Sequence, residues 1–436
     1  MFGKKPFFLL ISFILMVSVG AGTVYAMPVI SWQFAPQTAD VYVGSEITIS
    51  DWNEDQYQPA VAYNWKHHEY LVVWENQGDD GIEIYAQRVS ESGELLSWPF
   101  YVPDDDTYLQ SNRKEPDVAY DPVNDRYLVV WMYEAGTGGD FDIHGRFVPW
   151  DGLDQNLKEF TIVDWTSPQW EPKVAYGRTP EEFVVVWMNT PSGVSSYISA
   201  QRITAATGAF PDSAKTISSG SERRDDPDIA FDVAQNQYLI TWDIDNSGSG
   251  TDLDIEGIRL HGGSNNFAGS VISIAGWPNE EWHPRVAACS GMNKYLVVWE
   301  SKQGTHYDIY ARYVNGADGS LAAPIHVTDS TVNEQDPDVA CNESGNLFLM
   351  AWSQQYSNTS GPYGVSGRFA YSDSSVSDIF AIRPSYTSET SNRWYPWVGG
   401  GYSNFLVTWE HERGTYNDIH ARLVSPYGIF LPLILK

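Results

Sequence analysis

A tryptophan recurs seven times along the chain, at intervals of 57, 56, 55, 57, 53 and 57 residues. Each ends an apolar run such as Tyr70-Leu-Val-Val-Trp74, and a proline stands 15 residues before it in six copies and 13 residues before it in one. A period this regular indicates one supersecondary unit copied seven times. The tryptophans are Trp74, Trp131, Trp187, Trp242, Trp299, Trp352 and Trp409. The prolines are Pro59, Pro116, Pro172, Pro227, Pro284, Pro337 and Pro396.

Each repeat has the residue pattern of β-strands joined by turns. In the second repeat, Pro116–Tyr120 and Tyr127–Trp131 are separated by a polar turn, and Asp142–Arg146 follows after a loop. Such runs between clusters of Gly, Pro, Asn and Asp are typical of strands and hairpins. No segment shows sustained helical periodicity. We therefore predict an all-β chain of four-stranded antiparallel units, with a repeat of about 56 residues.

The run that ends in the tryptophan is apolar on both faces, as in Leu71–Trp74. A strand with no polar face must be covered on both sides. In a radial array each sheet lies between two neighbours, and closure into a ring removes the ends of the array. We predict a single seven-bladed β-propeller over residues 27–436, with the seven tryptophans as wedges between neighbouring blades.

Two segments compete to supply the strand that closes the ring. Residues 46–50, near the N-terminus, and residues 431–435, at the C-terminus, are both short apolar runs in the place of a fourth strand. We favour residues 46–50, because pairing the two ends of the chain would lock the ring.

The repeat motifs resemble those of a known group of proteins. The set Pro-x-Val-Ala-Tyr, Tyr-Leu-Val-Val-Trp and Asp-Ile-Tyr-Ala-Arg is similar to the repeats of bacterial secreted and cell-surface β-propeller proteins, and the similarity covers about residues 46 to 436. The resemblance implies an extracellular propeller. It implies no catalytic residues, because that group has none in common.

The N-terminus has the form of a secretory signal peptide. Lys4 and Lys5 precede an apolar run that reaches about Gly20, and Val24-Tyr25-Ala26 places small residues before a cleavage point. The alternative is an uncleaved anchor, but the apolar run is short for a bilayer span. We predict a signal peptide of residues 1–26 and a secreted protein, extracellular or at the cell surface.

The charge balance is strongly acidic. The chain has 56 acidic and 26 basic residues, a net charge of -30, and removal of residues 1–26 takes away only Lys4 and Lys5. Nucleic acids and anionic membranes are therefore excluded as partners, because phosphate binding needs clustered Lys and Arg. After signal cleavage no insertion into a membrane is expected.

Two cysteines, Cys289 and Cys341, occupy corresponding strands of adjacent repeats and are offset by one position relative to the proline. An offset of one residue normally turns side chains to opposite faces of a strand. We therefore favour two buried free thiols, while a secreted location permits a disulfide as the alternative.

Aromatic residues stand seven or two positions before several of the prolines. They lie in connections expected at the same end of the ring as the loops after each tryptophan, where a scaffold holds binding residues. One interpretation is stacking on a glycan. The interpretation we favour is packing of the seams between blades, because repeated positions usually serve the repeat. The candidate ligand-binding residues are Trp52, Tyr57, Trp165, Trp170, Trp277, Trp282 and Trp394.

One acidic loop resembles the calcium loops of EF-hands and integrin-type propellers. Asp243, Asp245 and Ser247 place oxygens at positions one, three and five, Gly248 stands at position six and Asp254 at position twelve. The loop departs from the pattern in having Asp instead of Glu at twelve and a glycine at eight. A Ca²⁺ site is one interpretation, and a solvated acidic loop, which we favour, is the other.

Catalytic signatures are absent from the sequence. It contains no Gly-x-Ser-x-Gly elbow and no His-Glu-x-x-His motif, and carboxylates are too numerous for a catalytic pair to be chosen. No catalytic residue is assigned. The leading hypothesis is a secreted non-enzymatic binding scaffold for a glycan or an extracellular protein. The alternatives are a carbohydrate-active hydrolase or lyase with acids at the ring centre, and a structural surface protein.

Overall fold

The computed structural model describes residues 41–426 apart from residues 80, 105–111, 135–138, 153, 155, 192–194, 290, 343–346, 358–360 and 386–390. The predicted signal peptide of residues 1–26 and the segment 431–435 lie outside the described residues. The described residues form strands, turns and bends without a helix, which confirms the all-β prediction. In this part of the chain there is accordingly no helix long and apolar enough to cross a membrane.

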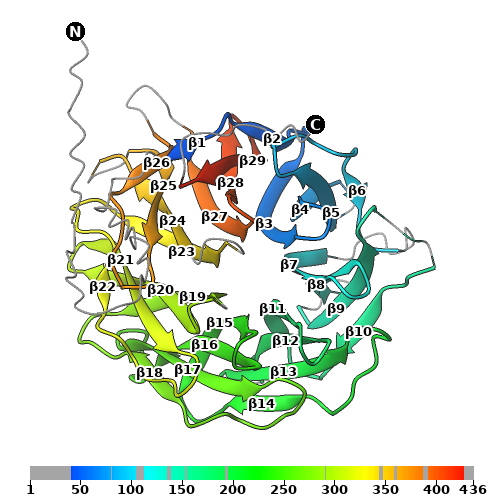
Figure 1. The fold of residues 1–436 in the computed structure, drawn as a ribbon, viewed down its shortest axis with the longest axis horizontal. Coiled ribbons are helices and arrows are strands. Elements are labelled where there is room, and N and C mark those ends of the chain that lie inside the picture. The colour runs from blue at the N-terminus through cyan, green and yellow to red at the C-terminus, as the bar shows by residue number, and fades with distance from the viewer. Residues whose placement is uncertain are drawn as a thin grey trace, which may run out of the picture. The chain divides into compact units, whose positions relative to one another are not determined.

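Successive strands of a repeat run outward from a common axis (Figure 1). The innermost strands are β3 (Asp55–Asn64), β7 (Asn112–Asp121), β11 (Gln169–Gly177), β15 (Arg223–Asp232), β19 (Glu281–Cys289), β23 (Glu334–Cys341) and β27 (Arg393–Gly400). The second strands are β4 (Glu69–Gly78), β8 (Arg126–Glu134), β12 (Glu182–Asn189), β16 (Gln237–Asp245), β20 (Lys294–Gln303), β24 (Phe348–Gln355) and β28 (Phe405–Arg413).

The remaining strands lie farther from the axis. The third strands are β5 (Gly81–Ser90), β9 (Phe141–Pro149), β13 (Tyr197–Thr204), β17 (Leu253–His261), β21 (His306–Asn315), β25 (Tyr363–Ala370) and β29 (Tyr416–Ser425). The outer strands are β6 (Phe100–Tyr101), β10 (Phe160–Val163), β14 (Lys215–Ser218), β18 (Ile272–Ala275), β22 (Ile325–His326), β26 (Phe380–Arg383) and β2 (Ile47–Ser50), and β1 (Tyr42–Val43) continues along β29.

Hydrogen bonds join these strands into six sheets, of which four are simple four-stranded antiparallel sheets. An eight-stranded sheet contains two such antiparallel units, linked by a single parallel pair between Ile82 of β5 and Asn112 of β7. The prediction of four-stranded antiparallel units is therefore confirmed. Each innermost strand contacts the innermost strand of the next repeat, and β27 contacts β3. The sheets are thus arranged radially, as in a β-propeller.

The last sheet takes its outer strand from the other end of the described chain. β2 pairs antiparallel with β29, with Ile47 opposite Ala421 and Thr48 opposite His420. Segment 46–50, which we favoured for this place, therefore ties the start of the described chain to its last complete strand.

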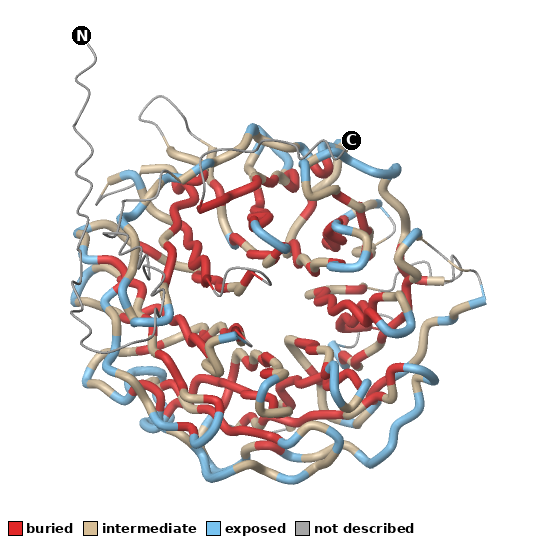
Figure 2. Tube along the Cα trace, viewed as in Figure 1, coloured by how far each residue is buried: buried red, intermediate tan, exposed pale blue. Residues whose placement is uncertain are grey.

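The apolar core is divided among the seams between neighbouring repeats. Seven buried clusters each combine side chains of two consecutive repeats, including the last and the first. All seven repeat tryptophans are fully buried in these clusters. In β4, Leu71 and Val73 face one seam while Val72 and Trp74 face the other, which explains why the strand has no polar face. Burial accordingly follows the inner strands, and exposure the outer loops (Figure 2).

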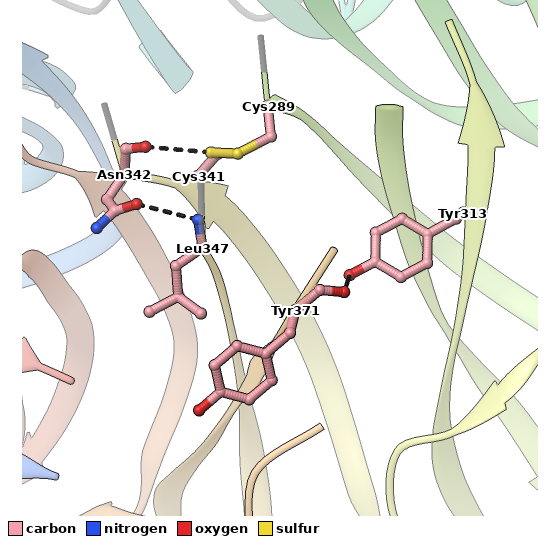
Figure 3. The surroundings of a disulfide bond; sticks show 6 residues. All are labelled: Cys289, Tyr313, Cys341, Asn342, Leu347 and Tyr371. Atoms are coloured by element: carbon pink, nitrogen blue, oxygen red, sulfur yellow. Dashed lines mark hydrogen bonds between the residues drawn. A yellow bond between two sulfur atoms is a disulfide. The ribbon is translucent and has the colours of Figure 1, made fainter. Parts of the chain in front are cut away.

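A disulfide joins Cys289 at the end of β19 to Cys341 at the end of β23, with the Cα atoms 5.5 Å apart (Figure 3). The expectation of two free thiols is therefore wrong. The opposite-face rule applies within one sheet, whereas these strands belong to two sheets that face each other. An offset of one residue is then what turns the two sulfurs together. Nearby, the Tyr313 hydroxyl donates to the Tyr371 carbonyl at 2.8 Å and links the same two repeats.

We expect Trp299→Ala to lower the free energy of unfolding by about 3–5 kcal/mol, because the fully buried indole fills the seam between the fourth and fifth repeats. Urea unfolding measures the change. The matched control is Trp98→Ala, since Trp98 is 89% exposed and its loss should leave stability nearly unchanged. Equal effects of the two substitutions would contradict the wedge role.

Candidate functional site

The residue directly before each repeat proline has a left-handed backbone. The φ angles of these residues lie between 48° and 55°. Each interrupts the register between the innermost and second strands, so that it and the proline form a bulge. A positive φ is uncommon for residues other than glycine and costs roughly 1–3 kcal/mol, and such strain gathers at functional sites. The residues are Gln58, Glu115, Glu171, Asp226, His283, Asp336 and Tyr395.

Contacts with the preceding repeat hold this conformation. The bulge turns the backbone N–H away from the sheet ladder, and in the first, second and sixth repeats an acidic side chain that directly follows a repeat tryptophan accepts it. Glu75 accepts from Glu115 N at 2.6 Å, and Glu410 accepts from Gln58 N at 2.8 Å. In the sixth repeat, Asp336 N donates to the corresponding glutamate of β20 at 2.8 Å. The buried carboxylates thus stabilise the bulge that points the next side chain inward.

These side chains surround a central cavity of about 210 Å³. The lining residues are Gln58, Glu115, Pro116, Glu171, Lys173, Asp226, His283, Arg285, Asp336, Pro337, Asp338, Tyr395, Pro396 and Trp397. Every one belongs to an innermost strand, and all seven left-handed residues are among them. The bulges therefore direct one side chain from each repeat into a single polar site.

An aromatic ring and two cations from different repeats meet in this cavity. Lys173 Nζ lies 4.7 Å and Arg285 Cζ lies 5.6 Å from the centroid of the Trp397 ring. Strands β11, β19 and β27 are thereby linked across the axis. Such cation–π contacts gain strength where water is scarce.

Two neighbouring carboxyl groups of the cavity titrate in opposite directions. Burial, together with the charges of Asp226 and Glu115, raises the pKa of Glu171 well above its usual range. Burial also acts to raise the pKa of Asp226, but the charges of His283 and Arg285 outweigh it and lower that pKa. Asp226 N donates to Glu171 Oε2 at 3.0 Å. The cavity therefore drives the pKa values of two adjacent carboxyl groups apart.

His283 fixes the charge of Asp226. Its Nδ1 lies 3.0 Å from Glu300 Oε1 and its Nε2 lies 3.5 Å from Asp226 Oδ2. Burial alone would lower the pKa of His283, but the two carboxylates raise it to about 10. The ring is therefore an imidazolium at neutral pH, and it keeps Asp226 ionised.

The predicted aromatic residues fall into two groups. Trp52, Trp165 and Trp277 pack against Trp74, Trp187 and Trp299, with ring centroids 6.3, 5.8 and 5.7 Å apart. Trp170 packs against Phe141 at 4.7 Å, and Trp282 lies 6.2 Å from Tyr307. Tyr57 and Trp394 line one groove of about 540 Å³ at the seam between the last and first repeats, and Trp394 also packs against Tyr363 at 4.2 Å. The structure thus brings together two of the seven candidates.

The carboxylates of the calcium-like loop do not converge. Ile244 is paired with Asp254, so the Asp254 side chain shares the face of Ile244 and lies opposite those of Asp243 and Asp245. Asp245 accepts the N–H groups of Ser247, Gly248 and Gly250, which closes the loop on itself. Asp243 is buried and turns toward His283 N, 3.4 Å away.

Among the described residues, one group of His and Glu has its ligand atoms within 4.8 Å of one another: Glu46, His411 and His420. Hydrogen bonds occupy its nitrogens. Arg393 lies 3.4 Å from His411 Nε2 and can only donate, so His411 Nδ1 donates to His420 Nε2 at 3.2 Å. His420 Nδ1 in turn donates to Glu46 Oε1 at 2.8 Å. The chain of bonds ties the residue before β2 to β28 and β29.

Sequence reasoning missed the left-handed residues. Glu115, Glu171, Asp226 and His283 stand directly before the repeat prolines, whereas the aromatic candidates stand two or seven positions before them. A signal was present, because this one position varies among charged and polar types inside an otherwise apolar motif.

Comparisons with known proteins identify a fold and no family. No protein-family model matches the chain, and no curated protein matches it. Among solved structures, the polysaccharide lyase Uly1 is similar at a TM-score of 0.54 and 8% identity, over 84% of this chain and 89% of that chain. An α-L-arabinanase of Penicillium chrysogenum complexed with arabinobiose has a TM-score of 0.49 and 11% identity, over 89% of this chain and 100% of that chain. A sialidase of Trypanosoma rangeli in complex with 2,3-difluorosialic acid has a TM-score of 0.48 and 10% identity, over 89% of this chain and 58% of that chain.

These comparisons correct the leading sequence-based hypothesis. The polysaccharide lyase Uly1, at a TM-score of 0.54, is a carbohydrate-active enzyme, so the comparisons contradict the hypothesis of a non-enzymatic binding scaffold. At 8% identity the likeness establishes the fold alone.

We expect His411→Tyr to weaken the acid sensitivity of folding. Burial, with the charges of His420 and Arg393, lowers the pKa of His411 from 6.5 to about 4. Between pH 6.5 and about 4, His411 binds a proton in the unfolded chain but not in the folded one. The free energy of unfolding therefore falls as pH decreases, by about 2–3 kcal/mol between about pH 7 and 4.5. Tyr133 occupies the equivalent position in the second repeat and stacks on His144. Urea unfolding at both pH values should show a smaller loss in the variant, and an unchanged loss would contradict this assignment.

Proposed function

We propose that this protein is a secreted carbohydrate-active enzyme, a glycoside hydrolase that cleaves a polysaccharide in the central cavity of a closed seven-bladed β-propeller. The seven sequence repeats and the contact between β27 and β3 support the blade number and the closure. The N-terminal signal-peptide pattern supports an extracellular location.

One arrangement carries the chemistry: Glu171 and Asp226 lie together in the cavity, with Asp226 N donating to Glu171 Oε2 at 3.0 Å. Burial raises the pKa of Glu171 well above its usual range, while the charges of His283 and Arg285 outweigh burial and lower that of Asp226. Hydrolysis of a glycosidic bond needs an acid for the leaving group and a base for water, and two carboxyl groups with separated pKa values supply both. Because Glu171 and Asp226 are held by bulges of adjacent repeats, their relative positions are fixed before substrate binds.

The proposed step conserves atoms and protons. Glu171 gives its proton to the glycosidic oxygen as the bond from that oxygen to the anomeric carbon breaks. Asp226 takes a proton from the water that adds to the same carbon, so the products are two shorter sugar chains. Proton exchange with solvent then restores both carboxyl groups. His283 acts as a positioning residue, because its charge keeps Asp226 ionised.

We expect Glu171→Gln and Asp226→Asn each to lower kcat by about 10²–10⁴-fold, because each removes one proton-transfer group. Reducing ends released from a panel of plant and microbial polysaccharides measure the rate. The control is Glu94→Gln, which changes an exposed glutamate that does not line the cavity and should be fully active. Full activity of both cavity variants would refute the hydrolytic assignment. So would an unsaturated sugar at the new chain end, because elimination leaves one and hydrolysis does not.

A further inference from the structure

A groove of about 540 Å³ lies beside the central cavity, at the seam between the last repeat and the first. Tyr395 lines both spaces, and Gln58 of the cavity donates its N–H to Glu410 of the groove at 2.8 Å. The two spaces are therefore neighbouring parts of one polar surface. The groove residues are Asp55, Tyr57, Trp394, Tyr395, Glu410, Glu412, Gly414, Thr415, Tyr416 and Asn417.

A small polar residue stands at this seam where two other seams carry a ring. Three residues before the third-strand partner of the repeat tryptophan, Phe141 packs on Trp170 at 4.7 Å and Tyr363 packs on Trp394 at 4.2 Å. Asn417 occupies the equivalent position in the last repeat and donates its N–H to Asp55 Oδ1 at 2.9 Å. With no large ring at that position, the space in front of Tyr57 stays open.

The groove combines aromatic rings with hydrogen-bond acceptors. Tyr395 is 43% exposed and Tyr416 is 37% exposed, so both rings are accessible from solvent. Glu410 and Glu412 offer carboxyl oxygens to hydroxyl donors, and burial raises the pKa of Glu410 to about 8. The lining residues include no Lys, Arg or His, so an anionic ligand would be repelled. Rings with apolar and polar faces beside acceptors suit a neutral sugar ring.

We propose that this seam groove is a substrate subsite that binds neutral sugar residues of the polysaccharide whose glycosidic bond reaches the central cavity. The inference rests on the proposed function and adds a substrate class to it, namely an uncharged glycan in place of a uronate or sulfated one. Asn417 determines specificity by leaving the groove open, and Tyr57, Trp394 and Tyr416 supply the rings.

The test fills the groove without touching the cavity. Asn417→Phe introduces the ring that Phe141 supplies in the second repeat, and Leu253→Phe makes the same change at the equivalent position of the fourth repeat as the matched control. Affinity electrophoresis through gels containing arabinan, xylan or polygalacturonate measures binding independently of cleavage. Circular dichroism and thermal unfolding confirm that both variants fold.

We expect a neutral polysaccharide to retard the wild-type protein and Leu253→Phe equally, and Asn417→Phe to bind about tenfold more weakly or worse, as for the loss of a stacking contact. Polygalacturonate should retard none of them. Equal retardation of Asn417→Phe and wild type, retardation by polygalacturonate alone, or no retardation by any neutral glycan would overturn the proposal. Glu171→Gln separates the two claims, because it should bind as wild type does. Binding of a neutral glycan by the wild-type protein without its cleavage would refute the hydrolase and leave the groove proposal standing.

Discussion

The structure depends on burial of the second strand between two neighbouring sheets. Leu71 and Val73 pack toward the following repeat while Val72 and Trp74 pack toward the preceding one, so no sheet can be stable alone. Each repeat thus needs two neighbours, and the contact of β27 with β3 meets this need for the first and last. Apolar burial at the seams is the dominant stabilising term.

The seams also make the functional site. Once two sheets face each other, a carboxylate after the tryptophan of one repeat meets the innermost strand of the next and accepts an N–H that the sheet ladder leaves free. That contact stabilises the left-handed bulges at Gln58, Glu115 and Asp336, whereas Glu171 itself accepts the N–H of Asp226. The bulges point these side chains into the central cavity. Packing, backbone strain and the acid–base pair are therefore linked physically.

Much of the fold was predictable from sequence, because the seam tryptophans, the strand pattern and the closing segment 46–50 depend on local periodicity. The Cys289–Cys341 bridge was not, since it depends on two different sheets facing each other. The cavity was not predicted either, because the sign of φ at Glu115 is set by a carboxylate 40 positions away. Of the aromatic candidates, only Tyr57 and Trp394 line the same groove, because Asn417 in the third strand of the last repeat leaves that seam open.

The central claim is that the cavity separates the protonation of two adjacent carboxyl groups. Carbon-13 NMR titration of the side-chain carboxyl groups of Glu171 and Asp226, assigned with the Gln and Asn variants, measures both pKa values directly. We expect the pKa of Glu171 to lie well above the ordinary range of glutamate and that of Asp226 to lie below the ordinary range of aspartate. Two ordinary values, or a raised value for both groups, would contradict the account.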